Sequence, residues 1–275
     1  MDRATELRRY TSLNALEHML RDSQLRLTRV DVFKDQFEGS VPKQQIDDQL
    51  PAFSSVNAML MMGESVAAQI PGAPGMPPLP INDPWTRMTI RRRVATRSAH
   101  ASCWNWGEES EAMWRLYCKD DGELGQGVAL RSTFGKLDAS IAHHDLIIGR
   151  VVYRLYHEGP AFNDDLDPFM HKRMGFECER EARVLSFDQH HYSTLALALT
   201  GLYGFAPVPD PPAELPEYIY IDWRPLDVAD AIVISPYATE VYEQRVKAAV
   251  AAIDPSAVAR LELSVLSERR YGANF

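Results

Sequence analysis

Three charged residues late in the chain stand two positions apart. They are Glu179, Glu181 and Arg183, in the stretch Phe-Glu-Cys-Glu-Arg-Glu-Ala-Arg-Val-Leu from residue 176 to 185. Alternate residues of a strand share a face, so a strand would place all three side chains on one side of a sheet. Neighbouring carboxylates repel each other unless a cation or ligand hydroxyls engage them, and Arg183 supplies one such cation. The stretch therefore predicts a strand that carries either a catalytic carboxylate site or a structural ion pair; a charged helix face is the alternative.

A second acidic group lies near residue 35. The segment Phe33-Lys-Asp-Gln-Phe-Glu38 combines Asp35 and Glu38 with two phenylalanines. It fits a turn capped by Asp35 as well as it fits a ligand-binding loop. Carboxylates are preferred ligands of magnesium and manganese, so Asp35, Glu38, Glu179 and Glu181 could together serve a metal-dependent nuclease. His100 and Cys103 have no second ligand pair at zinc-like spacing, and no dedicated metal site is predicted.

Aromatic residues cluster in the middle of the chain. Trp104 and Trp106 lie in a predicted strand, and Trp114 and Tyr117 in the helix that follows it. Such residues usually fill a core, but they could also form a stacking wall for a planar ligand ring.

Composition limits the classes of partner. The 275 residues carry a formal net charge of −9 and 45% hydrophobic residues, as in an ordinary globular protein and unlike a general nucleic-acid binder. Three scattered cysteines give no disulfide framework, and neither a signal peptide nor a long apolar span is evident. We expect a cytoplasmic protein without a membrane partner. The sequence predicts no particular oligomeric state.

The elements that must position these residues can be read from periodicity. A strand ending at Tyr10, a helix over 11–23 and a strand over 24–30 open the chain. Strands are predicted over 98–106, 126–134, 145–156, 177–187, 217–224, 230–236 and 258–266, and helices over 109–119, 134–144, 167–176 and 239–253. We expect one α+β domain over 1–275, with a mixed, split sheet and flanking helices. We also predict an insertion or lid at 43–100, which contains methionines at 59, 61 and 62.

The motifs together resemble a bacterial domain family of unknown function. The resemblance rests on Arg9-Tyr10, Phe33-x-Asp35-x-x-Glu38, Ser102-Cys103-Trp104, Met113-Trp114-x-x-Tyr117, Gly127-Val128, Lys172 and Phe176-x-x-Glu179-x-Glu181-x-Arg183, and covers about residues 8–268. Lys34 and Gln36 stand where that family usually has asparagine and proline. More distantly, the order of these motifs is similar to the ADP-ribosyltransferase superfamily.

The more distant similarity implies an ADP-ribosyltransferase-like fold and NAD as substrate. It implies catalytic roles for Glu181 and Glu179, one of which would hold the ribose 2′-hydroxyl and stabilise an oxocarbenium-like transition state. Arg9, Tyr10, Ser102, Trp104, Trp114 and Arg183 would then be the cofactor-binding residues. The protein would be a transferase or NAD glycohydrolase, a toxin or defence effector acting on a protein or nucleic-acid acceptor.

Two alternatives stay open beside that enzyme. One is a non-catalytic module that binds a nucleotide or a protein through its aromatic and acidic cleft, with Met59, Met61 and Met62 as further contacts. The other is the metal-dependent nuclease.

Overall fold

The computed structural model describes residues 1–35, 37–40, 92–120, 122–155, 166–200 and 212–267. The predicted methionine-rich lid contacts and most of the proposed insertion at 43–100 fall outside these ranges. In the described end of that range, residues 92–97 are helical and Ala99 begins a central strand of the sheet. The insertion or lid itself stays a prediction.

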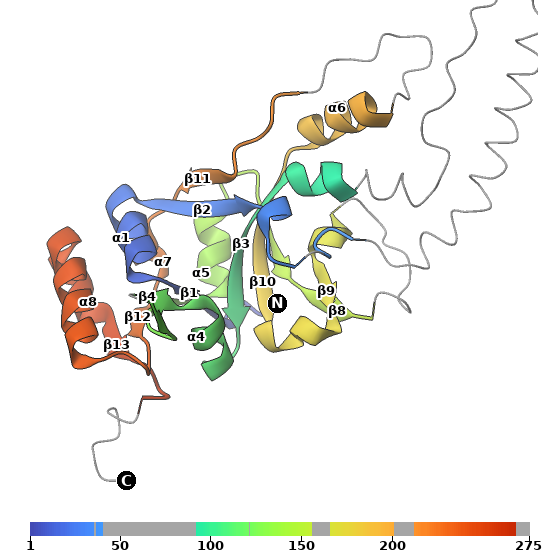
Figure 1. Cartoon of the computed structure of the whole chain (residues 1–275). Coiled ribbons are helices and arrows are strands. Elements are labelled where there is room, and N and C mark those ends of the chain that lie inside the picture. Colours follow the sequence, from blue (N-terminus) through green and yellow to red (C-terminus); the bar gives the residue numbers. More distant parts are fainter. Residues whose placement is uncertain (36, 41–91, 121, 156–165, 201–211, 268–275) are drawn as a thin grey trace, which may run out of the picture.

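One large mixed sheet organises the described chain (Figure 1). Its strands follow the order β11-β2-β3-β1-β6-β12-β13, and β10 pairs with β3 and with β7. All pairings in this sheet are antiparallel except β12 with β13. The strands are β1 (Glu6–Thr11), β2 (Gln24–Arg29), β3 (Ala99–Trp106), β6 (Val128–Thr133), β7 (Ile147–Arg150), β10 (Glu181–Phe187), β11 (Tyr218–Asp222), β12 (Ala231–Ile234) and β13 (Leu261–Leu263). The predicted α+β class with a mixed sheet is confirmed.

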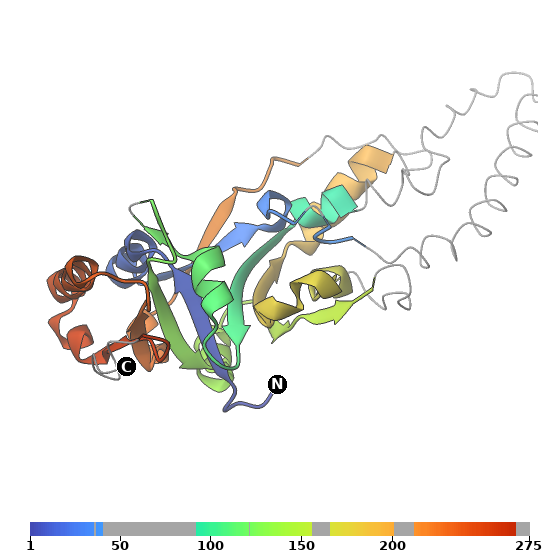
Figure 2. The same cartoon turned by 60° about the horizontal axis from the view of Figure 1, so that its bottom comes forward.

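Short strand pairs and helices surround the sheet. The short pairs are β4 (Lys119–Asp120) with β5 (Glu123–Leu124), and β8 (Val152–Arg154) with β9 (His171–Arg173). The α-helices are α1 (Leu13–Asp22), α4 (Glu111–Tyr117), α5 (Phe134–Ile141), α6 (Gln189–Thr200), α7 (Pro225–Val228) and α8 (Glu240–Ile253). The 3-10 helices are η1 (Val30–Val32), η2 (Asp167–Phe169), η3 (Met174–Glu179) and η4 (Pro255–Arg260). Helices α8 and α6 lie at opposite ends of the molecule (Figures 1 and 2).

Local chemistry explains several of these elements. Helix α1 begins after Ser12, whose hydroxyl accepts a hydrogen bond from the Ala15 amide, and its buried face is Leu13, Leu16, Met19 and Leu20. Helix α8 begins in the same way after Thr239. Both helices join the main core, which covers one face of the sheet.

Three predicted elements outside the charged stretch at 176–185 differ in the structure. The strand expected over 145–156 is two strands, because after Val151 the chain leaves β10 and β8 pairs with β9 instead. The helix expected over 167–176 is two 3-10 turns flanking strand β9, which starts after the Pro168 turn. The strand expected over 258–266 is reduced to β13, because Pro255 starts a 3-10 helix that runs to Arg260.

The sheet opens along one edge of β3. On its other edge, β3 pairs with β10 from Ala99 to Asn105. On the opening edge, β2 pairs only with His100 and Ala101, and β1 only with Asn105 and Trp106. Among the described strands, residues 102–104 have no pairing partner on that edge. Strands β1 and β2 separate there, and the chain between them forms α1.

Candidate functional site

Five charged side chains are buried together against the sheet; we call them the charge cluster. Each keeps at most 7% of its surface exposed, and the members are Glu38, Lys172, Glu179, Glu181 and Arg183. Charged residues are almost never this buried unless they are paired. The cluster therefore depends on its own internal contacts.

The predicted strand over 177–187 contains three members of the cluster, but only two of them lie in the observed strand β10. Glu181 and Arg183 are alternate residues of β10, as expected. Glu179 instead ends helix η3, and the chain turns into β10 at Arg180, whose φ of 40° is left-handed. The expectation that Glu177 to Arg183 form one continuous strand is therefore wrong. Glu179 and Glu181 still share one partner, because Lys172 Nζ contacts both carboxylates.

Arg183 uses all of its donors inside the protein. Its Nε donates to Glu181 Oε1, and its two terminal nitrogens donate to Glu38 Oε2 and Oε1 at 2.9 and 2.7 Å. The remaining two donors reach the Phe169 carbonyl and Glu181 Oε2. With five donors and five bonds, Arg183 has nothing left for a cofactor. Its predicted cofactor-binding role is replaced by that of holding Glu181 in place.

Lys172 joins the two late glutamates. Its Nζ lies 2.6 Å from Glu179 Oε2 and 3.1 Å from Glu181 Oε2. The other Glu179 oxygen, Oε1, accepts a 2.7 Å hydrogen bond from the Tyr117 hydroxyl. Tyr117 is 47% exposed, which makes it the link between the buried carboxylates and solvent. Glu179 is thus the cluster carboxylate that is bonded to an exposed side chain.

The cluster has an excess of one negative charge, with three carboxylates against one lysine and one arginine. Burial alone would raise the pKa of Glu181, but Arg183 and Lys172 outweigh it and lower that pKa to about 2. Burial acts against the charged form of Lys172 as well, yet Glu181 and Glu179 raise its pKa above the ordinary value. Both groups are therefore charged at neutral pH.

Cys103 lies on β3 opposite Arg183, beside the Glu181 carboxylate. Burial, and then the charge of Glu181, raises the pKa of its thiol well above the ordinary value. The thiol is therefore protonated at neutral pH. It is not an activated nucleophile.

Strand register separates the predicted site residues into two groups. Arg8, Asn105 and Glu181 are paired across three neighbouring strands, so their side chains share one face, which we call the carboxylate face. Arg9 and Trp104 are one residue away from this row and Ser102 is three residues away, so all three side chains lie on the other face. The Arg9 guanidinium donates to the Ser102 hydroxyl there and lies 5.9 Å from the Trp104 ring. These three residues do not meet Glu181 in one cleft.

The arginine on that other face bridges the opening in the sheet. Besides Ser102 on β3, Arg9 reaches the Arg26 carbonyl on β2 at 3.5 Å. Burial lowers the pKa of its guanidinium to about 10. Arg9 on β1 thus contacts both β2 and β3 at the opening.

Of the four aromatics predicted as core or stacking wall, Trp104 and Trp114 are core residues, whereas Trp106 is half-buried and Tyr117 is exposed. Trp114 is fully buried and Trp104 is 2% exposed, so neither offers a ring face to a ligand. Tyr10 lies on the carboxylate face, but it packs edge-on against Trp114 at 4.8 Å and its hydroxyl accepts a hydrogen bond from the Ser110 amide. For Trp104 and Trp114, the core interpretation is the one that the structure favours.

Two residues that contact Glu179, Tyr117 and Lys172, were not among the predicted site residues. We call the side of the charge cluster at which Tyr117 is exposed its mouth. Tyr117 was noted only as a possible stacking residue, and Lys172 only as part of the resemblance. Asp35 and Glu38 do more than shape a turn: Asp35 accepts from Arg173 at 2.7 Å, and Glu38 pairs with Arg183. The two acidic residues in the segment 33–38 were the sequence feature that could have predicted its ion pairs with Arg173 and Arg183.

The metal interpretation finds little support in this geometry. All six oxygens of Glu38, Glu179 and Glu181 accept hydrogen bonds from lysine, arginine or tyrosine. Within the described ranges, no group of three or more His, Cys, Asp or Glu side chains is arranged to hold a metal ion.

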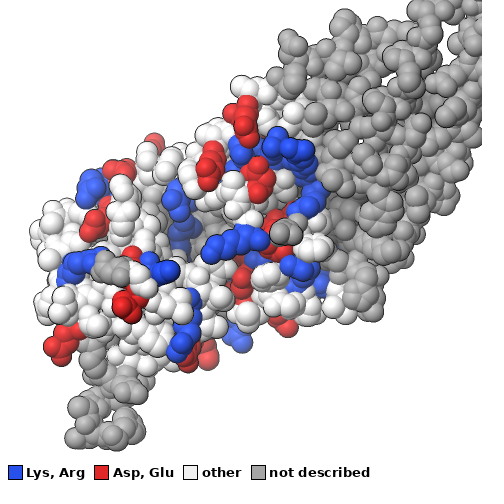
Figure 3. Space-filling model, viewed as in Figure 1, with Lys and Arg blue, Asp and Glu red and all other residues white. Residues whose placement is uncertain are grey.

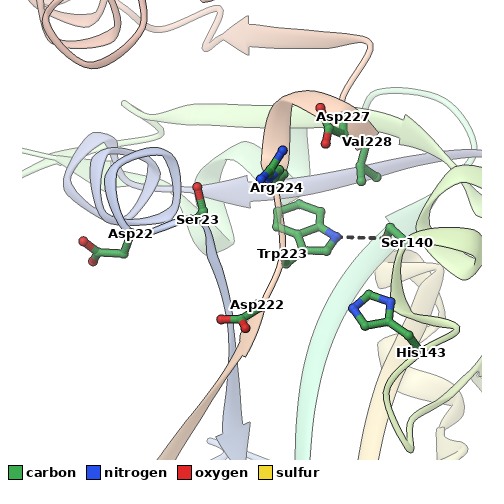
Figure 4. Close-up of a pocket in the computed structure, with 9 residues that line it drawn as sticks. All are labelled: Asp22, Ser23, Ser140, His143, Asp222, Trp223, Arg224, Asp227 and Val228. Carbon is green, nitrogen blue, oxygen red and sulfur yellow. Dashed lines mark hydrogen bonds between the residues drawn. The ribbon is translucent and has the colours of Figure 1, made fainter.

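A separate pocket of about 500 Å³ lies away from the charge cluster (Figure 4). Trp223 and Ser140 line it and are joined by a 2.9 Å hydrogen bond. The Trp223 ring also packs edge-on against Trp104, at 6.1 Å, which places the pocket on the side of the sheet opposite Glu181. Its acidic residues Asp22, Asp222 and Asp227 lie on different sides of the opening (Figure 4).

Comparisons with protein-family models, with curated proteins and with solved structures each found no match. Among the helices of the described residues, none has the length and apolar character needed to cross a membrane.

Proposed function

We propose that the protein cleaves the nicotinamide–ribose bond of NAD, as an ADP-ribosyltransferase or NAD glycohydrolase, with its reaction centre at the exposed end of the charge cluster. The observation that carries the proposal is the pair Glu179 and Glu181, both buried and both bridged by Lys172. Two carboxylates close together and in excess over their cations suit a reaction that develops positive charge on a sugar ring.

The geometry favours Glu179 over Glu181 as the residue that touches the substrate. Glu181 is held by Arg183 and Lys172, whereas one oxygen of Glu179 is held only by the hydroxyl of the exposed Tyr117. A ribose hydroxyl can replace the tyrosine hydroxyl at that oxygen without leaving a buried charge unpaired. Glu181, ionised through its pKa of about 2, adds negative charge behind it.

In the proposed reaction, Glu179 accepts a hydrogen bond from the ribose 2′-hydroxyl and stabilises the cation that forms at the anomeric carbon. The carbon–nitrogen bond breaks, and its electron pair leaves with neutral nicotinamide. Water or an acceptor oxygen then attacks the anomeric carbon and loses its proton to solvent. No metal or further reactant is needed.

The test is release of nicotinamide from NAD by the purified protein. We expect release by the wild type and a loss of at least about 100-fold in Glu179→Gln, which keeps the shape of the side chain but removes its charge. Glu111→Gln is a matched control, because Glu111 is an exposed glutamate on α4. Absence of release from every variant would refute the proposed activity.

The satisfied hydrogen bonds of the cluster favour a second candidate, a non-catalytic nucleotide-binding module. A cluster in which every carboxylate oxygen has a donor can be purely structural, leaving only the mouth to bind a ligand. This candidate predicts thermal stabilisation by nucleotide without turnover.

A further inference from the structure

The mouth of the charge cluster carries a second group of side chains that the proposed reaction does not use. Arg173 lies between two phenylalanines, 4.1 Å from the Phe37 ring and 5.1 Å from the Phe176 ring. We call Phe37, Arg173 and Phe176 the stacking platform. Phe37 is 46% exposed, so one large aromatic side chain is presented to solvent beside a cation.

The platform is held in place before any ligand arrives. The Asp35 carboxylate, whose side chain is only 5% exposed, accepts from the Phe37 amide at 3.0 Å and from Arg173 at 2.7 Å. One carboxylate thus fixes both the turn that carries the first ring and the cation beside it. Glu38, which follows Phe37, accepts a hydrogen bond from Arg183 and so holds the segment against β10. Such preorganisation lowers the entropic cost of binding.

The platform adjoins the reaction centre through Phe176. The ring of Phe176 lies 4.9 Å from Lys172 Nζ, and that nitrogen bridges Glu179 and Glu181. A ligand with one ring on the platform can therefore place its other end at Glu179. Arg173 and the exposed Lys34 add positive charge along the way. On the face seen in Figure 3, Lys and Arg side chains are spread among Asp and Glu side chains.

We infer that the stacking platform binds the adenine ring and adjoining phosphate of an adenine nucleotide. This inference rests on the proposed function, since NAD carries such a nucleotide at the end opposite its nicotinamide. Stacking on an aromatic ring next to a guanidinium suits any flat base carrying a phosphate. A single exposed phenylalanine with one or two cations fits one nucleotide. A nucleic-acid strand would need a longer row of rings and a basic groove, which the net charge of −9 does not favour.

The experiment is titration of AMP into the purified chain by calorimetry, with nicotinamide mononucleotide as a second probe. We expect AMP to bind the wild type and to bind Phe37→Ala about 5- to 100-fold more weakly. Phe37→Tyr keeps the ring and should retain binding. Asp35→Asn should also weaken AMP binding, because it removes the carboxylate that holds Arg173 beside the Phe37 ring. Tyr220→Ala is the control, since Tyr220 is another exposed aromatic residue, on β11, with 57% of its surface exposed.

The outcomes separate the inference from the proposed function. If NAD is not cleaved but Phe37→Ala still weakens AMP binding, the nucleotide-binding role of the platform is supported and the proposed reaction is refuted. If NAD is cleaved and Phe37→Ala leaves both AMP affinity and the KM for NAD unchanged, the platform is wrong. Equal loss of AMP binding and nicotinamide mononucleotide binding in Phe37→Ala would overturn the assignment to adenine, because the platform would then bind any flat ring that carries a phosphate. Failure of the wild type to bind AMP would refute it directly.

Discussion

Arg183 and Glu38 are joined by two parallel hydrogen bonds, although 145 residues separate them in the chain. This fork-to-fork pairing is the geometry that guanidinium and carboxylate groups favour. It docks the segment 37–40 onto β10 and so brings the mouth of the charge cluster together. The same segment is tied to the helix at 92–97, where Arg92 donates to the Glu38 carbonyl at 2.9 Å. Stability and site geometry are therefore linked.

Breaking this pair should destabilise the fold strongly. Removing one partner of a buried ion pair leaves an uncompensated charge and costs about 3–5 kcal/mol. We expect Arg183→Met to lower the free energy of unfolding by this amount in urea denaturation. Glu262→Gln breaks the more exposed pair of Glu262 with Arg131 and should change it by less than about 1 kcal/mol. Equal effects of the two substitutions would contradict the structural role of the cluster.

The pKa of Glu181 predicts acid sensitivity. Because its folded-state pKa of about 2 lies below its ordinary value near 4.5, the ionised carboxylate stabilises the folded state above pH 4.5. That contribution is on the order of 3 kcal/mol and is lost as the pH falls from about 4.5 to 2. Urea midpoints measured along this range should fall more steeply for the wild type than for Glu181→Gln. Parallel curves for the two proteins would contradict the assigned pKa.

Arg180 offers a test of the turn that delivers Glu179. Its left-handed φ of 40° costs a non-glycine residue roughly 1 kcal/mol. Arg180→Gly and Arg180→Ala both lose the side chain, including its contact with the Trp106 ring at 5.7 Å. We expect the glycine variant to be about 1 kcal/mol more stable than the alanine variant by thermal denaturation. An alanine variant as stable as the glycine variant would argue against this backbone conformation.

Much of the fold could be predicted from sequence, and the reason is periodicity. Strand β2 alternates Leu25 and Leu27 inward, and α1 repeats its leucines at helical spacing, so both follow directly from pattern. The turn at Arg180 could not be predicted, because left-handed positions are normally marked by glycine or asparagine. The extent of β10 was therefore overestimated.

Register explains the errors in the candidate site. Sequence indicates that Arg9 and Ser102 lie in strands, but not which face each side chain takes. A shift of one residue between neighbouring strands reverses that assignment. The structure places Arg8 and Asn105, rather than Arg9 and Ser102, in the row of Glu181. Burial of Trp104 and Trp114 was the more ordinary expectation for tryptophan, and it holds.

Tyr117 provides a kinetic test of substrate access. In the proposed reaction a ribose hydroxyl replaces the Tyr117 hydroxyl at Glu179 Oε1. Tyr117→Phe keeps the ring and removes the competing donor, so we expect a lower KM for NAD with little change in kcat. Burial, together with the charge of Glu179, raises the pKa of Tyr117, so the hydroxyl does not ionise near neutral pH. A large fall in kcat would instead indicate that the hydroxyl takes part in the reaction.

The most direct test of the central claim is the rate at which wild type, Glu179→Gln and Glu111→Gln release nicotinamide from NAD. All three rates are measured under identical conditions, and circular dichroism verifies that each protein is folded. The proposed function predicts release by the wild type and by Glu111→Gln, and a loss of at least about 100-fold in Glu179→Gln. Equal rates in all three folded proteins, or no release from the wild type, would contradict a catalytic role for the charge cluster.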